Sequence, residues 1–318
     1  MRIARVFPTR TRATPDDELA FTGDPPFFAE ADAVHISVAF TWDLPEAERL
    51  AMQWWPIAPV TIGGPACGTR GEDFTPGMYV KHGYTITSRG CPNKCWFCSV
   101  WRREGSEIRE LPIHDGWNLL DDNILACSDE HIKAVFNMLS KQKRAPEFTG
   151  GLEAARLKPW HVSELRKLHP KQLFFAYDGP EDREPLHAAG KMLVDGGFTV
   201  SSGVLRAYVL IGYPHDTFED AGKRLMECFD VGFLPMAMLY RDTKGKRDPT
   251  WMRFQRKWAR PAITKSIYRR ANVRTEVPQE AQGTEKNHRD ESPGAIQLGH
   301  PATGQLLHDG ALPLFGEP

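Results

Sequence analysis

The stretch Cys91-Pro92-Asn93-Lys94-Cys95-Trp96-Phe97-Cys98 brings three cysteines together, with three and then two residues between them. No fourth cysteine joins the run. Thiolates this close in sequence commonly share a metal ion or a cluster. A structural zinc site takes four ligands in a closed tetrahedron, whereas a cubane iron–sulfur cluster takes one ligand for each iron. Three cysteines therefore favour a cluster in which one iron stays open to a ligand that reacts.

The spacing resembles the CxxxCxxC signature of the radical S-adenosylmethionine (radical SAM) superfamily, in which an aromatic residue precedes the last cysteine. Phe97 stands at that position here. The resemblance implies a [4Fe–4S] cluster held by Cys91, Cys95 and Cys98, whose open iron binds the amino and carboxylate groups of SAM. It also implies reductive cleavage of SAM to a 5′-deoxyadenosyl radical, which abstracts hydrogen from a substrate. The sequence does not identify that substrate, and it assigns no catalytic residue beyond the cofactor site.

The composition is that of an intracellular enzyme. The chain has 318 residues, 41% of them hydrophobic, and a formal net charge of -1, so it has no general attraction for nucleic acid or membranes. Six cysteines, three of them clustered, do not suggest a secreted disulfide framework. Residues 1–12 lack the apolar core of a signal peptide, and no run is long enough to span a bilayer. We expect a cytoplasmic protein without a membrane partner.

Strand-like and helix-like segments alternate along the part of the chain that begins just before the cysteine run. Strands are expected at 84–88, 117–121, 147–149, 173–177, 205–211 and 234–240, with helices at 129–141, 160–168, 181–194 and 217–230. This alternation predicts an α/β fold with a parallel sheet buried on both faces. The resemblance sharpens it to a partial (β/α)6 TIM-like barrel over residues 79–243. Functional groups of such folds gather at the carboxyl ends of the strands, where the cysteine run stands.

A glycine-rich element, residues 148–153, follows the third expected strand. It is similar to the superfamily element that approaches the SAM amino group, so Gly150, Gly151 and Glu153 are candidate cofactor contacts. Glycine allows the backbone to come close to a ligand. The usual form is Gly-Gly-Glu, and here Leu152 is inserted before the glutamate. A plain turn between strand and helix is the alternative.

Two more candidates lie at later strand ends. Residues 210–217 resemble an element that flanks the adenine of SAM in several radical SAM groups, which makes Ile211, Gly212 and Pro214 candidate cofactor contacts. Asp178 ends the fourth expected strand, where relatives place a polar residue against the SAM ribose. Simple turn chemistry is the alternative for the aspartate.

Residues 1–78 form a separate expected lobe. Two strand-like runs, a helical segment and a further strand-like run predict a small α/β unit, which resembles the end of the cobalamin-binding lobe that precedes the barrel in one group of radical SAM enzymes. The cobalamin ligand motif DxHxxG is absent. His35 lies between Val34 and Ile36, so we interpret it as a strand residue.

The chain changes character after the sixth strand. Residues 244–271 are rich in Arg and Lys, and Trp251, Phe254 and Trp258 fall on one face of a predicted helix. We favour a helical extension that docks on the barrel through its aromatic residues, while its basic face binding RNA is the alternative. Residues 272–318 are polar and without periodicity, which predicts a disordered tail.

A radical SAM enzyme is therefore the leading hypothesis. It needs an electron donor such as flavodoxin or ferredoxin, and its substrate is a small molecule or macromolecule that we do not name. The rival is an RNA-interaction protein that binds zinc or a cluster without radical chemistry. A third hypothesis, an enzyme that modifies RNA, combines the two features.

Overall fold

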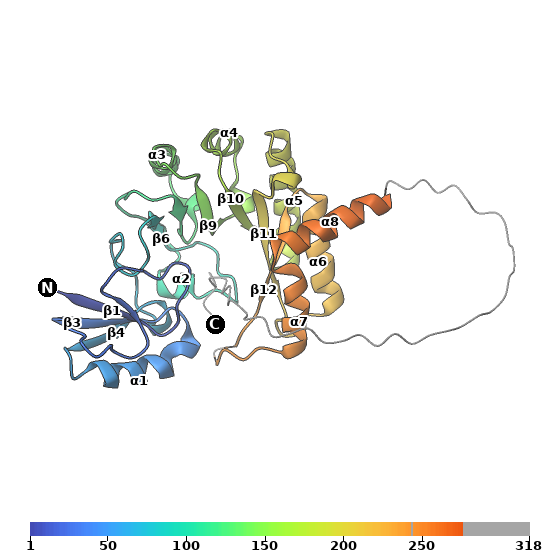
Figure 1. Ribbon diagram of the computed structural model, residues 1–318. Helices are drawn as coiled ribbons and strands as arrows, with labels where there is room; N and C mark the ends of the chain where they lie inside the picture. Colours follow the sequence, from blue (N-terminus) through green and yellow to red (C-terminus); the bar gives the residue numbers. More distant parts are fainter. Residues whose placement is uncertain (243, 276–318) are drawn as a thin grey trace, which may run out of the picture.

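The computed structural model of the chain describes residues 1–242 and 244–275. Its strands form a four-stranded parallel sheet, a six-stranded parallel sheet and an antiparallel pair. The smaller sheet lies with helix α1 (Leu44–Trp54) at the lower left of Figure 1, and the larger sheet lies at its centre and right. The α/β class predicted from the sequence is confirmed.

The six-stranded sheet carries its strands in chain order, each beside the one before it. Across the sheet these are β12 (Leu234–Leu239), β11 (Leu205–Ile211), β10 (Gln172–Ala176), β9 (Glu147–Leu152), β8 (Asn118–Leu119) and β5 (Tyr84–Thr85). All neighbours are parallel, as the alternation with helices predicts. Because β12 and β5 each pair on one side only among the described strands, the sheet is open, and the partial barrel stays a prediction.

Helices connect these strands and cover one side of the sheet (Figure 1). They are α3 (Asp129–Ser140), α4 (Pro159–Leu168), α5 (Arg183–Asp195) and α6 (Phe218–Asp230). The start of α3 is fixed by Ser128, whose hydroxyl accepts from the N–H of His131 at 3.1 Å. Thr217 caps α6 in the same way, accepting from Asp220 N at 3.1 Å. Both starts agree with the predicted helices to within a residue.

The two faces of the six-stranded sheet have different surroundings, because successive side chains of a strand point to opposite sides. Phe175 and Val209 are fully buried in the large core that the helices share. Phe174, Tyr208 and Met238 form a separate small cluster on the other face. The rings of Phe174 and Tyr208 stack there at 4.2 Å.

The first predicted strand, 84–88, is wrong as a single element. Its start is β5, whereas its end belongs to β6 (Ser88–Arg89), which pairs antiparallel with β7 (Arg109–Glu110). The buried carboxylate of Asp121 accounts for the break. It accepts from Thr87 N at 2.6 Å, which takes this backbone N–H out of the sheet ladder, and from the Ser88 hydroxyl at 2.7 Å.

The N-terminal lobe is a four-stranded parallel sheet in the order β2-β1-β3-β4. Its strands are β1 (Ile3–Phe7), β2 (Ala20–Thr22), β3 (Ala33–Ser37) and β4 (Val60–Gly63). The short strand β2 was not predicted. His35 lies within β3, and its Nδ1 is 2.7 Å from the Tyr79 hydroxyl, as expected for a strand residue. Whether the lobe ends at residue 78 stays a prediction.

The helical extension consists of two helices rather than one, α7 (Pro249–Trp258) and α8 (Pro261–Thr275). Proline is favoured at the first position of a helix and disfavoured inside one, so Pro261 separates them. Helix α8 includes residues 272–275 of the predicted tail, and 276–318 lie outside the described residues. Among the described helices, none combines the length and apolar character needed to cross a membrane.

Candidate functional site

The cysteine run forms the loop between β6 and helix α2 (Val100–Arg103). Two contacts fix the beginning of this loop. Cys91 N donates to Gly105 O at 3.2 Å, and Gly90 N donates to the Asp122 carboxylate at 2.9 Å. Gly90 has a φ of 92°, and a Cβ there would lie 2.3 Å from Glu107 O, so only glycine fits. The loop is therefore pinned before its first cysteine.

The three thiols lie close enough to influence one another's protonation. Burial is the largest cause that raises the pKa of each, to about 12 for Cys95 and about 11 for Cys98. For Cys95 the neighbouring thiols Cys98 and Cys91 are the next causes. A metal cation bound to such thiols would have to displace their protons, because a metal ligates the thiolate form.

Hydrogen-bond donors face two of the three sulfur atoms. The Asn93 backbone N–H donates to Cys91, and the Val100 N–H donates to Cys98. The side-chain Nδ2 of Asn123 lies 3.5 Å from Cys91 Sγ. Hydrogen bonds to the sulfurs are one of the levers that set the potential of an iron–sulfur cluster. This donor set fits a cluster bound by Cys91, Cys95 and Cys98.

A single-ion site is a poorer fit. In the described part of the chain, no three His, Cys, Asp or Glu side chains are grouped closely enough to hold one metal ion. A structural zinc site needs four such ligands around one centre. A cubane distributes its thiolates over separate irons, which places the sulfur atoms farther apart.

The aromatic residues of the loop extend the site toward the last two strands. Phe97 is buried and meets Trp96 edge to face at 5.4 Å. Trp96 is 47% exposed and lies 5.7 Å from the ring of Tyr213 and 5.8 Å from that of Tyr240. Tyr213 follows β11 and Tyr240 follows β12, so the cysteine loop and the carboxyl ends of both strands meet here. Sequence reasoning missed this aromatic contact.

The predicted glycine-rich element occupies the carboxyl end of β9. A Cβ on Gly150 would lie 2.3 Å from the backbone oxygen of Asp121, so this glycine is required by packing. Gly151 has a φ of 97°, and a Cβ there would meet nothing within 4 Å. Of the two, Gly151 is the one whose backbone is open to a ligand.

Glu153 lies beside the cysteine loop. Its Oε2 accepts from Asn123 Nδ2 at 2.6 Å and pairs with Arg156 at 2.7 Å. The carboxylate is near enough to Cys91 to help raise the pKa of that thiol, although burial is the largest cause. The structure therefore brings Glu153 to the cysteines despite the insertion of Leu152.

Asp178, just after β10, links the ends of two neighbouring strands. Its Oδ1 accepts from the backbone N–H of Leu210 at 2.9 Å, which ties this strand end to β11. Burial, followed by the nearby charge of Asp182, raises the pKa of Asp178 to about 7. Asp178 also contributes to the raised pKa of Cys95, so the carboxyl group is close to the site.

The predicted element after β11 is shaped by packing as well. Ile211 is fully buried in the main core, and Pro214 is exposed. Gly212 has a φ of 72°, and a Cβ there would lie 2.8 Å from Leu239 and 2.9 Å from Trp251. The turn thus lies at the edge of the site, and Tyr213 is its residue that contacts the cysteine loop.

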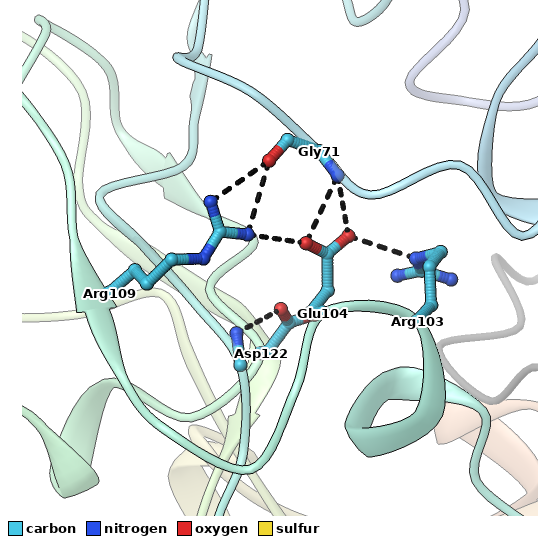
Figure 2. Close-up of polar contacts among 6 residues, drawn as sticks. Gly71, Arg103, Glu104, Arg109 and Asp122 are labelled. Carbon is cyan, nitrogen blue, oxygen red and sulfur yellow. Dashed lines mark hydrogen bonds and ion pairs between the residues drawn. The ribbon is translucent and has the colours of Figure 1, made fainter.

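A buried polar network at the end of α2 was also missed by sequence reasoning, and Figure 2 shows its contacts. Glu104, 2% exposed, accepts from Arg103 Nε at 2.9 Å and from Arg109 Nη2 at 2.7 Å. It also accepts from Gly71 N at 3.1 Å, while Arg109 donates to Gly71 O at 3.1 Å. The neighbouring Asp122 has its pKa raised to about 6, chiefly by burial. This network fastens the segment around Gly71 to the end of α2.

Comparisons with known proteins find a weak structural likeness. No family model matches the chain, and no curated protein matches it. Among solved structures, coproporphyrinogen III oxidase (HemN) from Escherichia coli, described as a radical SAM enzyme, is similar with a TM-score of 0.30 and 14% sequence identity. The similarity covers 50% of this chain and 40% of that one, so the chain spans less than half the length of HemN. The likeness is weak, and function is inferred from the site residues themselves.

Proposed function

We propose that the chain is a radical SAM enzyme in which Cys91, Cys95 and Cys98 hold a [4Fe–4S] cluster. The observation that carries the proposal is the set of three neighbouring thiols with N–H donors directed at Cys91 and Cys98, next to the carboxyl ends of a parallel sheet. Carboxyl ends of parallel strands are where such folds place their chemistry. When bound, such a cluster supplies an electron to SAM, which yields a 5′-deoxyadenosyl radical that takes hydrogen from the substrate.

The residues around the thiols are proposed to hold and orient the cofactors. Three thiolates leave one iron for the amino and carboxylate groups of SAM. Gly151 offers backbone carbonyls at a point where no side chain intervenes. Glu153, fixed by Asn123 and Arg156, offers a carboxylate that can attract an ammonium group. Phe97, the aromatic residue before Cys98, is proposed to contact SAM at the same site.

The later strand ends are proposed to enclose the nucleoside part of SAM. Ile211, Gly212 and Pro214 supply the turn beside the adenine, and Asp178 supplies a carboxyl group near the ribose. One oxygen of Asp178 is engaged by Leu210, so the second oxygen is the one proposed for the ligand. The chemical identity of the substrate is left open.

The chemistry requires an external electron donor such as flavodoxin or ferredoxin, and a reducing compartment such as the cytoplasm. Both are proposals. Lys94 and Trp96 are exposed, so the cysteine loop is reachable from solution.

Metal analysis after anaerobic reconstitution tests the proposal. We expect about four irons and four sulfides per chain, and methionine and 5′-deoxyadenosine on reduction in the presence of SAM. About one zinc per chain, with no iron retained and no SAM cleavage, would instead favour the zinc-binding RNA-interaction hypothesis.

A further inference from the structure

The N-terminal lobe contains a cavity at the point where its strand order reverses. From β1 the chain passes to β2 on one side and then to β3 on the other side of β1. In open parallel sheets, ligands bind outside the carboxyl ends of the strands at such a switch point. A cavity of about 90 Å³ lies there, lined by Phe7 and Thr9 after β1 and by Ser37 and Ala39 at the end of β3. Strand β1 runs from the N-terminus toward the centre of the molecule, so the cavity is at its inner end (Figure 1).

Most of the accessible lining of the cavity is apolar, and its polar side chains are five hydroxyls and one carboxylate. The hydroxyls are those of Thr9, Thr11, Thr14, Ser37 and Tyr79, and the carboxylate is that of Asp43. Thr11 and Thr14 bond to each other at 3.2 Å and Tyr79 lies 2.7 Å from His35 Nδ1, so Ser37 and Asp43 are the groups left for a ligand. Among the described residues that line the cavity, none is Lys, Arg or His. Within the described residues the Ser37 hydroxyl makes no side-chain hydrogen bond, so it remains available to a ligand.

Asp43 is placed at this cavity instead of capping its own helix. It occupies the position before α1, yet its side chain accepts no capping hydrogen bond there. The carboxylate accepts a hydrogen bond from the side chain of Thr9, which lies in the loop that follows β1. Burial raises the pKa of Asp43, and the nearby Arg241 opposes that shift.

The charges select the class of ligand. A carboxylate without a lining cation repels an anion such as phosphate. Because Arg241 already compensates part of the Asp43 charge, a cationic ligand gains little. A neutral ligand with hydroxyl donors suits the site, since the two oxygens of a carboxylate accept from two adjacent hydroxyls, as acidic residues do for ribose at switch points.

We propose that this cavity binds a vicinal diol, either a small free polyol or sugar or the ribose of a ribonucleoside. A volume of about 90 Å³ holds about six waters, which matches the diol-bearing part of such a ligand. The proposal does not depend on iron–sulfur or SAM chemistry, because the cavity residues belong to the N-terminal lobe and its link to the first barrel strand.

A purely structural role is the competing explanation. The Asp43–Thr9 contact would then only fasten the loop after β1 to the start of α1. Under that explanation, Asp43→Asn lowers thermal stability and no diol binds to the wild-type chain.

Isothermal titration calorimetry of the full chain separates these explanations. The probes are D-ribose, glycerol, uridine and 2′-deoxyuridine. The variants are Asp43→Asn, which removes the charge, and Ala39→Leu, which fills the cavity from an exposed position. Glu48→Gln is the matched control, since Glu48 is an exposed acid on the same helix that does not line the cavity.

We expect saturable binding of at least one diol by the wild type, weakened about tenfold or more by Asp43→Asn and by Ala39→Leu and unchanged in Glu48→Gln. Uridine binding without 2′-deoxyuridine binding assigns the site to a ribonucleoside, and binding of ribose or glycerol alone assigns it to a free sugar or polyol. The proposal is overturned if none of the diols binds at up to about 10 mM, or if both cavity variants bind as the wild type does.

Discussion

The side-chain amide of Asn123 donates to the carboxylate of Glu153, with Nδ2 2.6 Å from Oε2. The same Nδ2 lies 3.5 Å from Cys91 Sγ. Asn123 is 4% exposed, and its buried Oδ1 has no hydrogen-bond partner among the described residues. One amide thus joins the end of β8, the end of β9 and the first cysteine, and it presents a free carbonyl oxygen at the same place.

Asn123→Asp tests whether this amide tunes the cysteine site. The new carboxylate faces Glu153 and a thiolate, and each like-charge pair adds about 4 kcal/mol or more of repulsion at an effective dielectric constant of about 20. We expect a reduction potential lower by on the order of 100 mV, or partial loss of iron. Redox titration followed by EPR measures the shift. Asn137→Asp, an exposed change on α3, is the control, and an equal shift in both variants would refute a local effect.

Replacing any one of Cys91, Cys95 and Cys98 with alanine should abolish cluster binding and SAM cleavage. None of the three belongs to the apolar core of the sheet, so we expect the fold to survive. Iron and sulfide content, visible absorbance and circular dichroism report on these properties together. Cys67→Ala, at an exposed position outside the cysteine run, should behave as the wild type. A variant of the loop that kept full cluster content and cleavage would show that its cysteine is not a ligand.

Gly151→Val should weaken SAM binding by more than it weakens folding. The valine Cβ enters open space, where the proposed ligand lies, and the positive φ adds about 1–3 kcal/mol of strain. Gly23→Val matches that strain, because Gly23 has a φ of 86°, open surroundings and a place in the N-terminal lobe. Equilibrium dialysis with SAM and thermal melts compare the two. Equal SAM affinity in both variants would exclude Gly151 from the site.

The elements that were predicted well carry strong local signals. Strand β11 was predicted at its observed bounds because Leu205–Ile211 is an almost uninterrupted apolar run. Helices α3 and α6 were predicted close to their observed bounds, and their capping residues, Ser128 and Thr217, act within a single turn.

What escaped prediction depends on contacts between distant segments. The splitting of β5 from β6 follows from Asp121, 34 residues after Thr87. Glu104 reaches Gly71 across 33 residues, and Asn123 reaches Glu153 across 30. A local pattern does not specify such pairs, because burial and chain path decide them. For the same reason the sequence suggested Gly150 as a ligand contact, whereas its packing on Asp121 already requires glycine.

His161 should make stability fall in mild acid. It is fully buried, and burial lowers its pKa from 6.5 to about 4, with Lys158 adding to the effect. Its Nδ1 accepts from Lys158 N at 3.0 Å, which requires the neutral ring. The unfolded chain binds a proton below pH 6.5 and the folded chain does not, so this contribution is complete above that pH and is lost toward pH 4.

The measurement is the difference in unfolding free energy between wild type and His161→Gln as a function of pH. Taking the difference cancels buried acids such as Asp178, whose raised pKa gives the opposite slope. We expect the advantage of the wild type to shrink by roughly 2–3 kcal/mol between pH 6.5 and 4. The exposed His169→Asn should show no such trend, and a pH-independent difference for His161 would disprove its buried neutral state.

The last prediction concerns α7. Its aromatic residues pack inward: Trp251 lies 4.2 Å from Phe218, and Trp258, 8% exposed, lies 6.2 Å from Phe229. Its basic residues Arg253, Arg256 and Lys257, with Arg260 just after it, are exposed. If α7 serves only to cover the core with its aromatic side chains, which we call the sealing role, Trp258→Ala should lower the free energy of unfolding by about 3–5 kcal/mol. Changing the four basic residues to Gln should then leave stability and SAM cleavage unchanged.

RNA binding through the same helix predicts a different result. Each phosphate contact releases counterions, so affinity would fall steeply with salt, and the fourfold Gln variant would lower the affinity and flatten that slope. Filter binding of a generic RNA over a range of salt concentrations, together with thermal melts, measures both properties. We expect the sealing role alone, because the aromatic face is already engaged with α6 and the exposed basic face has no aromatic residue left to stack on a base. RNA binding at physiological salt that the fourfold variant loses would overturn this expectation.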